Sequence, residues 1–248
     1  MEENAYITAI AAGTFYLIAS YRLLRLSRRT RERPELLLGL YFALSGLYYL
    51  VYNSPSLLGI DQWPLPIGIA IEWTYTIGVL PYLFFIRAVF RRDDAWAGWL
   101  VGACSAFMLV GMGEATATGR VEPVLDNPWF FMEWLGYTIP CIWMGCEAML
   151  CRQGAKKRAR IGLCPAIVAN RYLLLALFGG FQVLACFADL YWAHDKAGGE
   201  AVSMISDALL GGAEIASVTL LWLAFFPPRS YENWITERAV ILPTPMEE

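Results

Sequence analysis

Charged residues are scarce in this sequence: Asp, Glu, Lys and Arg together make up 17% of the 248 residues, whereas 58% are hydrophobic. A soluble domain carries about a quarter charged residues, because its surface must face water. The apolar residues occur in blocks of about 20, the length at which a helix crosses roughly 30 Å of hydrocarbon. The low charge therefore argues against a soluble domain and predicts an all-α, polytopic integral membrane protein.

Histidine is rarer still, because His194 is the only one in the chain. One histidine cannot supply both axial ligands of a bis-histidine haem, and without a CxxC pair among the six cysteines we expect no zinc site. The last apolar block has no lysine, so we expect no retinal Schiff base. The chain also lacks the GxSxG, HExxH and phosphate-loop motifs. These absences favour a non-enzymatic protein, although an enzyme that uses carboxylates alone stays open.

Seven apolar blocks are long enough to cross a membrane. They cover residues 5–26, 35–53, 66–90, 96–113, 129–151, 171–193 and 201–226. Pro34 and Pro128 mark the starts of two blocks, and Pro227 with Pro228 ends the seventh, since a proline pair cannot continue a helix. We therefore predict one seven-helix transmembrane domain, residues 1–228, followed by a short cytoplasmic tail, residues 229–248.

The basic residues lie almost entirely in alternate connections between these blocks. Of the 19 lysines and arginines, only Arg120 and Lys196 fall in the other set of connections. Short loops with this bias stay in the cytoplasm. The pattern predicts a multi-pass protein of the inner (plasma) membrane, with the N-terminus outside and the C-terminus inside.

Small residues four positions apart predict where helices approach each other closely. Gly98 and Gly102 form a GxxxG motif in the fourth block, and Ala208 with Gly212 forms a similar pair in the seventh. An alternative is that these residues only reflect the general abundance of small side chains in membrane helices.

Acidic residues inside the spans are the candidates for a functional site, because ionisable groups are costly in a membrane. They are Glu72, Glu133, Asp189, Asp207 and Glu214. Counted from the predicted outer boundary, four of them lie within roughly 6–9 Å, and Glu214 is deeper, near the midplane. No lysine lies in any span to pair with them. We expect these five acids to line one outward-opening cavity if their helix faces point inward.

Such a cavity would bind a proton, a metal ion such as Ca²⁺, or an organic cation, since oxygen ligands suit hard cations. The sequence does not identify the metal or any cofactor. Aromatic residues beside the acids would help to hold a cation or a flat ligand; they are Trp73, Tyr75, Trp134, Tyr137, Tyr191 and Trp192. Two alternatives stay open: each acid bonds a polar side chain on a neighbouring helix and only fixes packing, or the acids are unrelated to one another.

A second group of charges is expected at the cytoplasmic side. Glu147 lies about one turn inside the fifth block, and Arg87 and Arg171 lie at the inner ends of the third and sixth. An ion pair between Glu147 and one of these arginines would tie the inner helix ends together. A latch that opens and closes is the alternative.

Two stretches carry a family resemblance: RERPELLLG at 31–39 and RARIGLCPAIVANRYLL at 158–174. They resemble segments of bacterial seven-helix membrane proteins whose activity is uncharacterised. The resemblance implies a bacterial inner membrane and the same seven-span layout, and it implies no catalytic residue.

Three functions are consistent with these features. The leading hypothesis is a receptor-like protein that binds or senses a small ligand, proton or cation from the outer side. A proton- or cation-coupled transporter and a structural or accessory subunit of a larger membrane complex are the alternatives. We expect the lipid bilayer as a partner, together with a protein in the membrane or on its cytoplasmic side, and no nucleic acid.

Overall fold

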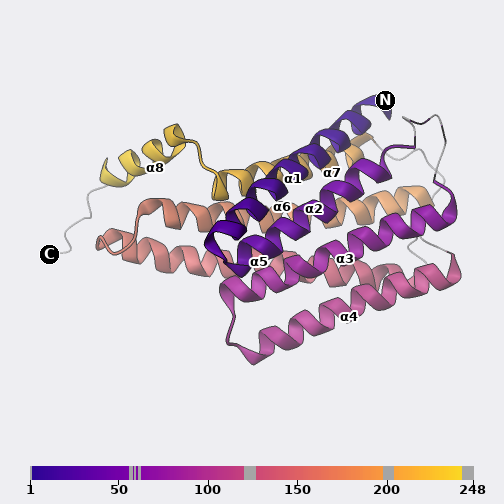
Figure 1. The fold of residues 1–248 in the computed structure, drawn as a ribbon, viewed down its shortest axis with the longest axis horizontal. Helices are drawn as coiled ribbons and strands as arrows, with labels where there is room; N and C mark the ends of the chain where they lie inside the picture. Colours follow the sequence, from indigo (N-terminus) through magenta and orange to yellow (C-terminus); the bar gives the residue numbers. More distant parts are fainter. Residues whose placement is uncertain are drawn as a thin grey trace.

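The computed structural model describes residues 2–55, 58, 60, 63–119, 127–197 and 204–241, and side chains from residue 10 on except those of 195–197, 204–208 and 238–241. Every regular element in these ranges is an α-helix (Figure 1). The helices are α1 (Glu2–Thr30), α2 (Arg33–Tyr52), α3 (Leu65–Phe90), α4 (Ala95–Thr118), α5 (Pro128–Arg160), α6 (Ala166–Ala197), α7 (Met204–Phe225) and α8 (Arg229–Ile241).

The helix ends follow from local sequence chemistry. Proline stands in the first turn of α2 and α5, where its missing N–H costs no hydrogen bond. Asn127 caps α5, because its side-chain oxygen accepts the Trp129 N–H at 3.0 Å. Gly119 ends α4 with a φ of 67°, a left-handed conformation that glycine adopts without strain.

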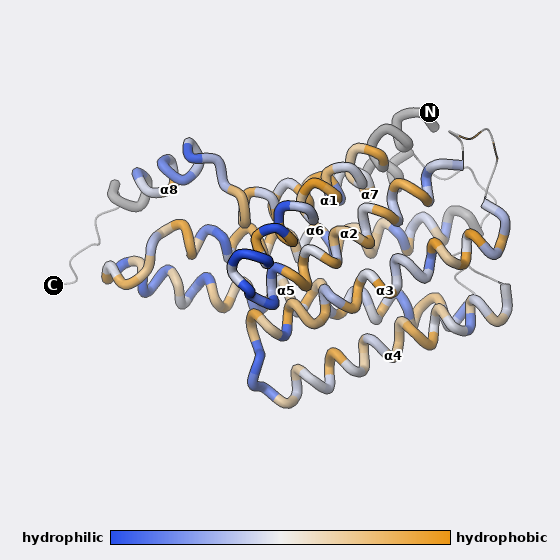
Figure 2. Tube along the Cα trace, in the orientation of Figure 1, coloured by the Kyte–Doolittle hydropathy of each residue, from blue (hydrophilic) through white to orange (hydrophobic). Residues whose placement is uncertain are grey.

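Helices α1 to α7 form a ring of antiparallel neighbours. Each packs against the next in the chain, α7 packs against α1 to close the ring, and α3 also contacts α5 (Figure 1). The hydrophilic residues gather at the end of the bundle that holds the α1–α2 and α3–α4 connections, marked by Arg28, Arg29, Arg91 and Arg92 (Figure 2). We call this the basic end.

Four helices are long and apolar enough to cross a membrane: α2, α3, α4 and, over Ala166–His194, α6. Leu209–Phe225 of α7 and Arg229–Glu237 of α8 form a fifth candidate as a pair bent by 77°. Helices α1 and α5 are not among the candidates found in the described residues. The chain is therefore an all-helical protein with four to five membrane-spanning candidates, which indicates a multi-pass membrane protein.

Two features at the basic end go beyond the sequence prediction. Helices α5 and α6 have 33 and 32 residues, and their hairpin extends past the α1–α2 and α3–α4 connections (Figure 1). The predicted tail contains α8, which packs against α6 through a hydrogen bond from Asn170 Nδ2 to the Tyr231 hydroxyl at 2.8 Å.

The closest helix contacts lie at other glycines than the predicted ones. A Cβ added to Gly179 of α6 would stand 2.7 Å from the Gly145 nitrogen and 2.8 Å from the Cys141 carbonyl oxygen of α5. In contrast, a Cβ on Gly102 or Gly212 would meet no atom within 4 Å. The GxxxG prediction for α4 was therefore wrong at Gly102, because that position faces outward.

Candidate functional site

Glu214 is the centre of the buried polar core. It lies halfway along α7 and is only 7% exposed. The Tyr16 hydroxyl of α1 donates to Glu214 Oε2 at 2.5 Å, a short hydrogen bond. The polar groups of Tyr49 and Gln182 also interact with this carboxyl. Among the described residues, no lysine or arginine pairs with it.

Gln182 extends the polar core from α7 to α5 and α2. Its side chain is fully buried, and its Oε1 accepts a hydrogen bond from the Tyr137 hydroxyl. The Tyr137 hydroxyl in turn lies 3.3 Å from that of Tyr41. The Gln182 Nε2 lies near the Glu214 carboxyl, but it makes no hydrogen bond of ordinary geometry to any residue that the structure describes. The network therefore contains a buried donor available to a bound group.

Three further predicted acids lie beside this core. Glu133 of α5 accepts the Thr76 hydroxyl of α3 at 2.8 Å, and the Glu72 carboxyl interacts with the Tyr48 hydroxyl of α2. Glu72 interacts electrostatically with Glu133 and Asp189, and Asp189 interacts with Glu214. Acids from α3, α5, α6 and α7 are thus close enough to affect one another. Asp207 lies in α7, but its side chain lies outside the described residues.

The acids are held individually and do not form a metal cluster. In the described part of the chain, no three His, Cys, Asp or Glu side chains are placed to hold a metal ion. Repulsion between neighbouring carboxylates favours a proton or a cation among them. The arrangement suits binding of a proton or a small cation at Glu214, where hydroxyl and amide groups converge.

Tyrosines form most of the wall around the acids, and sequence reasoning missed most of them. Tyr16 stacks on Tyr49 with ring centres 5.7 Å apart, and Tyr41 stacks on Tyr82 at 5.0 Å. A signal was present in α2, where tyrosines at positions 41, 48, 49 and 52 share helical spacing. Their number on one short helix favours an inward-facing polar stripe.

The predicted aromatic residues have different surroundings in the structure. Tyr75 and Tyr137 face each other with ring centres 5.8 Å apart, inside the polar core. Trp73 donates to the Thr116 hydroxyl and Trp134 to the Cys186 carbonyl oxygen, so both connect neighbouring helices. Tyr191 is 51% exposed.

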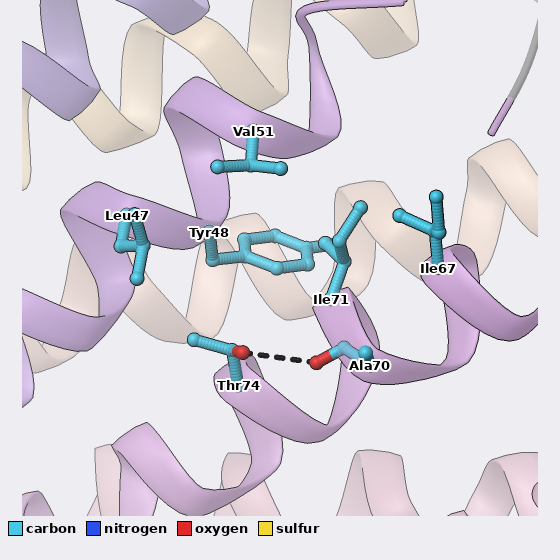
Figure 3. A pocket seen from close by; sticks show the side chains of 7 residues that line it. All are labelled: Leu47, Tyr48, Val51, Ile67, Ala70, Ile71 and Thr74. Atoms are coloured by element: carbon cyan, nitrogen blue, oxygen red, sulfur yellow. Dashed lines mark hydrogen bonds between the residues drawn. The ribbon is translucent and has the colours of Figure 1, made fainter.

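A groove opens between α2 and α3, away from Glu214. It has a volume of about 200 Å³ and is lined by Leu47, Tyr48, Val51, Ile67, Ala70, Ile71 and Thr74 (Figure 3). We call it the α2–α3 groove. None of the predicted acids lines it. The Tyr48 side chain connects the groove to the acids, because its hydroxyl interacts with Glu72.

At the basic end, Glu147 pairs with Arg91 rather than with Arg87 or Arg171. Arg91 Nε lies 2.7 Å from Glu147 Oε1, and Trp143 Nε1 donates to the same oxygen at 3.3 Å. This carboxylate raises the pKa of the Arg91 guanidinium, chiefly through the hydrogen bond. Arg87 instead lies against Gly98 of α4, and Arg171 is exposed. The tie between helix ends is therefore made by the residue that follows α3.

We expect Arg91→Gln to lower the melting temperature clearly more than Arg92→Gln does. Glu147 is buried, so loss of Arg91 leaves a carboxylate without its cation. Arg92 is exposed and serves as the matched control. Thermal unfolding in detergent measures the difference, and Arg91→Gln combined with Glu147→Gln should recover part of the loss. Equal melting temperatures for the two single variants would show that the pair contributes nothing to stability.

Residues 31–39 and 158–174, on which the expected family resemblance rests, include no residue of this polar core. The guide to function is therefore the geometry around Glu214. No known protein family, curated protein or solved structure matches this chain.

Proposed function

We propose that the chain crosses the inner membrane seven times, with the N-terminus outside and the basic end in the cytoplasm. The bias of lysine and arginine toward the basic end supports this orientation. Helices α1, α5 and α7 complete the seven spans, because each has more than the roughly 20 residues needed to cross hydrocarbon. Helix α8, bent by 77° from α7, would then lie along the cytoplasmic surface.

The function that the site supports best is that of a receptor-like sensor, without catalysis, for a proton or a small cation reaching Glu214 from the outer side. The observation that carries this proposal is that four acids from four helices interact electrostatically with one another. None of them has a lysine or arginine partner among the described residues. A buried carboxylate in this setting is costly unless a proton or cation neutralises it.

A change at Glu214 would affect helix packing directly. The Glu214 carboxyl of α7 accepts a hydrogen bond from α1 and interacts with polar groups of α2 and α6. Binding of a proton or cation to this carboxyl would therefore change contacts among four helices. A ligand shifts a conformational equilibrium only by its differential affinity for the two states. Because α6 also contributes to the hairpin at the basic end, binding near Glu214 has a direct structural route to the cytoplasmic side.

The tip of the α5–α6 hairpin is the surface where we expect a cytoplasmic protein partner. Helix α5 is about 50 Å long at 1.5 Å per residue, roughly 20 Å more than the hydrocarbon thickness. The tip exposes Ile161 (69%) and Leu163 (74%), next to the basic residues Lys157, Arg158 and Arg160. Apolar side chains in water beside positive charge suit an acidic protein with an apolar pocket.

Thermal unfolding of the purified full-length protein in detergent tests the sensor function. We expect the melting temperature to rise either as the pH falls from about 9 to about 5 or on addition of one cation among Li⁺, Na⁺, K⁺ and choline. A ligand at about 100 times its Kd contributes about 2.7 kcal/mol to the stability of the folded state. The increase should be lost in Glu214→Gln, which keeps the side-chain shape and removes the charge.

Glu237→Gln is the matched control, because Glu237 is exposed on α8 and far from the core. It should respond to pH and cations as the unchanged protein does. Curves that are flat, or identical for Glu214→Gln and the unchanged protein, would mean that the acids only fix helix packing. The sensor proposal would then be abandoned.

A proton-coupled transporter is the second candidate. The observation that favours it is the chain of buried polar groups from Glu214 through Gln182 and Tyr137 to Tyr41, halfway along α2. Transport requires proton uptake into liposomes that is lost in Glu214→Gln. If proton uptake is absent, or is the same in Glu214→Gln as in the unchanged protein, the transporter is contradicted and the sensor is favoured.

A further inference from the structure

The α2–α3 groove is mainly apolar, although a tyrosine and a threonine are among the residues that line it. The Thr74 hydroxyl donates to the Ala70 carbonyl oxygen of its own helix at 2.9 Å (Figure 3). The Tyr48 hydroxyl interacts electrostatically with the Glu72 carboxyl, which does not line the groove. Five of the seven lining residues are aliphatic, so the groove offers a ligand mainly apolar surface.

The groove lies between two helices that are long and apolar enough to cross a membrane. Its lining residues belong to the last turns of α2 and the first turns of α3, at the end of these helices opposite the basic end. Its rim residues Leu47 and Ile67 are 47% and 44% exposed. An apolar cavity of about 150 Å³ is large enough to bind benzene. The volume of about 200 Å³ therefore suits several methylene groups and is too small for a helix about 10 Å across.

We propose that the α2–α3 groove binds one acyl chain of a membrane phospholipid, laid against the ring of Tyr48. The chain packs between the aliphatic side chains of α2 and α3, and the headgroup stays at the membrane surface beyond the end of α2. Burial of apolar surface and close packing supply the affinity. Because Tyr48 contacts both the chain and Glu72, occupancy of the groove fixes a side chain that also belongs to the acid site.

A phosphatidylcholine that carries a diazirine midway along one acyl chain tests this proposal. The purified protein is titrated with the probe in detergent, irradiated, and the labelled peptides are identified by mass spectrometry. We expect labelling of residues 47–51 and 67–74 that saturates as the probe fraction rises. Contact with bulk lipid would instead label all outward-facing helices and increase linearly.

Ala70→Phe fills the groove with a phenyl ring, and we expect the saturable labelling to be lost. Ala106→Phe is the matched control, since Ala106 is an exposed alanine on α4, and its labelling should be unchanged. Val51→Phe fills the groove from α2 and provides a second variant should Ala70→Phe unfold. The proposal would be overturned if α4 is labelled as strongly as the groove, or if labelling of the groove does not saturate. Saturable labelling that persists in both Ala70→Phe and Val51→Phe would overturn it as well. None of these outcomes depends on Glu214.

Discussion

Replacement of Gly179 by alanine is expected to lower the melting temperature by roughly 5–10 °C, and replacement by leucine to prevent folding of the bundle. The added Cβ would stand 2.7 Å from a backbone nitrogen and 2.8 Å from a carbonyl oxygen of α5. Overpacking typically costs about 1–3 kcal/mol, and here the upper part of this range applies because backbone atoms cannot rotate away. For a protein of this size each kcal/mol corresponds to roughly 2–4 °C.

The neighbouring Gly180 provides the matched control, because a Cβ there would meet no atom within 4 Å. Gly180→Ala should unfold at or slightly above the temperature of the unchanged protein, since alanine has the higher helix propensity. Equal effects of the two substitutions would contradict the close α5–α6 contact. The contact matters for the site as well, because Gln182 lies one turn from Gly179 and bonds Tyr137 of α5.

The parts of the fold that sequence could predict are those that depend on local chemistry. Each of the seven apolar blocks coincides with a helix, because hydropathy and length are properties of a continuous segment. The starts of α2 and α5 follow from Pro34 and from Asn127 with Pro128, through local capping. The seven-span count and the orientation are proposals that rest on the same charge pattern.

The parts that escaped prediction depend on polar segments and on helix rotation. The extensions of α5 to Arg160 and of α6 from Ala166 lie beyond the apolar blocks, so hydropathy gave no signal for them. Helix α8 begins directly after Pro227 and Pro228 and is amphipathic rather than apolar. The Arg91 partner of Glu147 could not be chosen over Arg87, because the two arginines are one turn apart on the same helix end.

At the acid site, too, local sequence predicts some features and helix packing determines the others. The presence of intramembrane acids is visible in the sequence, but their partners are set by which faces meet in the ring. Tyr16 and Glu214 are 198 positions apart and come together only because α7 closes the bundle against α1. The contact between α7 and α1 therefore determines which polar groups surround Glu214.

Tyr16→Phe is expected to lower the melting temperature by roughly 4–8 °C, because it removes the hydroxyl that donates to Glu214 at 2.5 Å. A hydrogen bond to a charged group contributes about 1.5–3 kcal/mol, and each kcal/mol corresponds to roughly 2–4 °C here. Tyr21→Phe is the matched control on the same helix, because Tyr21 is 66% exposed. Its effect should stay within about 0.5 kcal/mol.

The double variant with Glu214→Gln separates the charge from the hydrogen bond. With a neutral amide as acceptor, the Tyr16 hydroxyl contributes only about 0.5–1.5 kcal/mol, so Tyr16→Phe should cost less in this background. A difference of at least about 0.5 kcal/mol between the two backgrounds marks a direct interaction. Additive effects would mean that the carboxyl is already neutral in the unchanged protein, occupied by a proton. Non-additive effects at neutral pH that disappear as the pH falls would instead place the binding of that proton within the working range of the sensor.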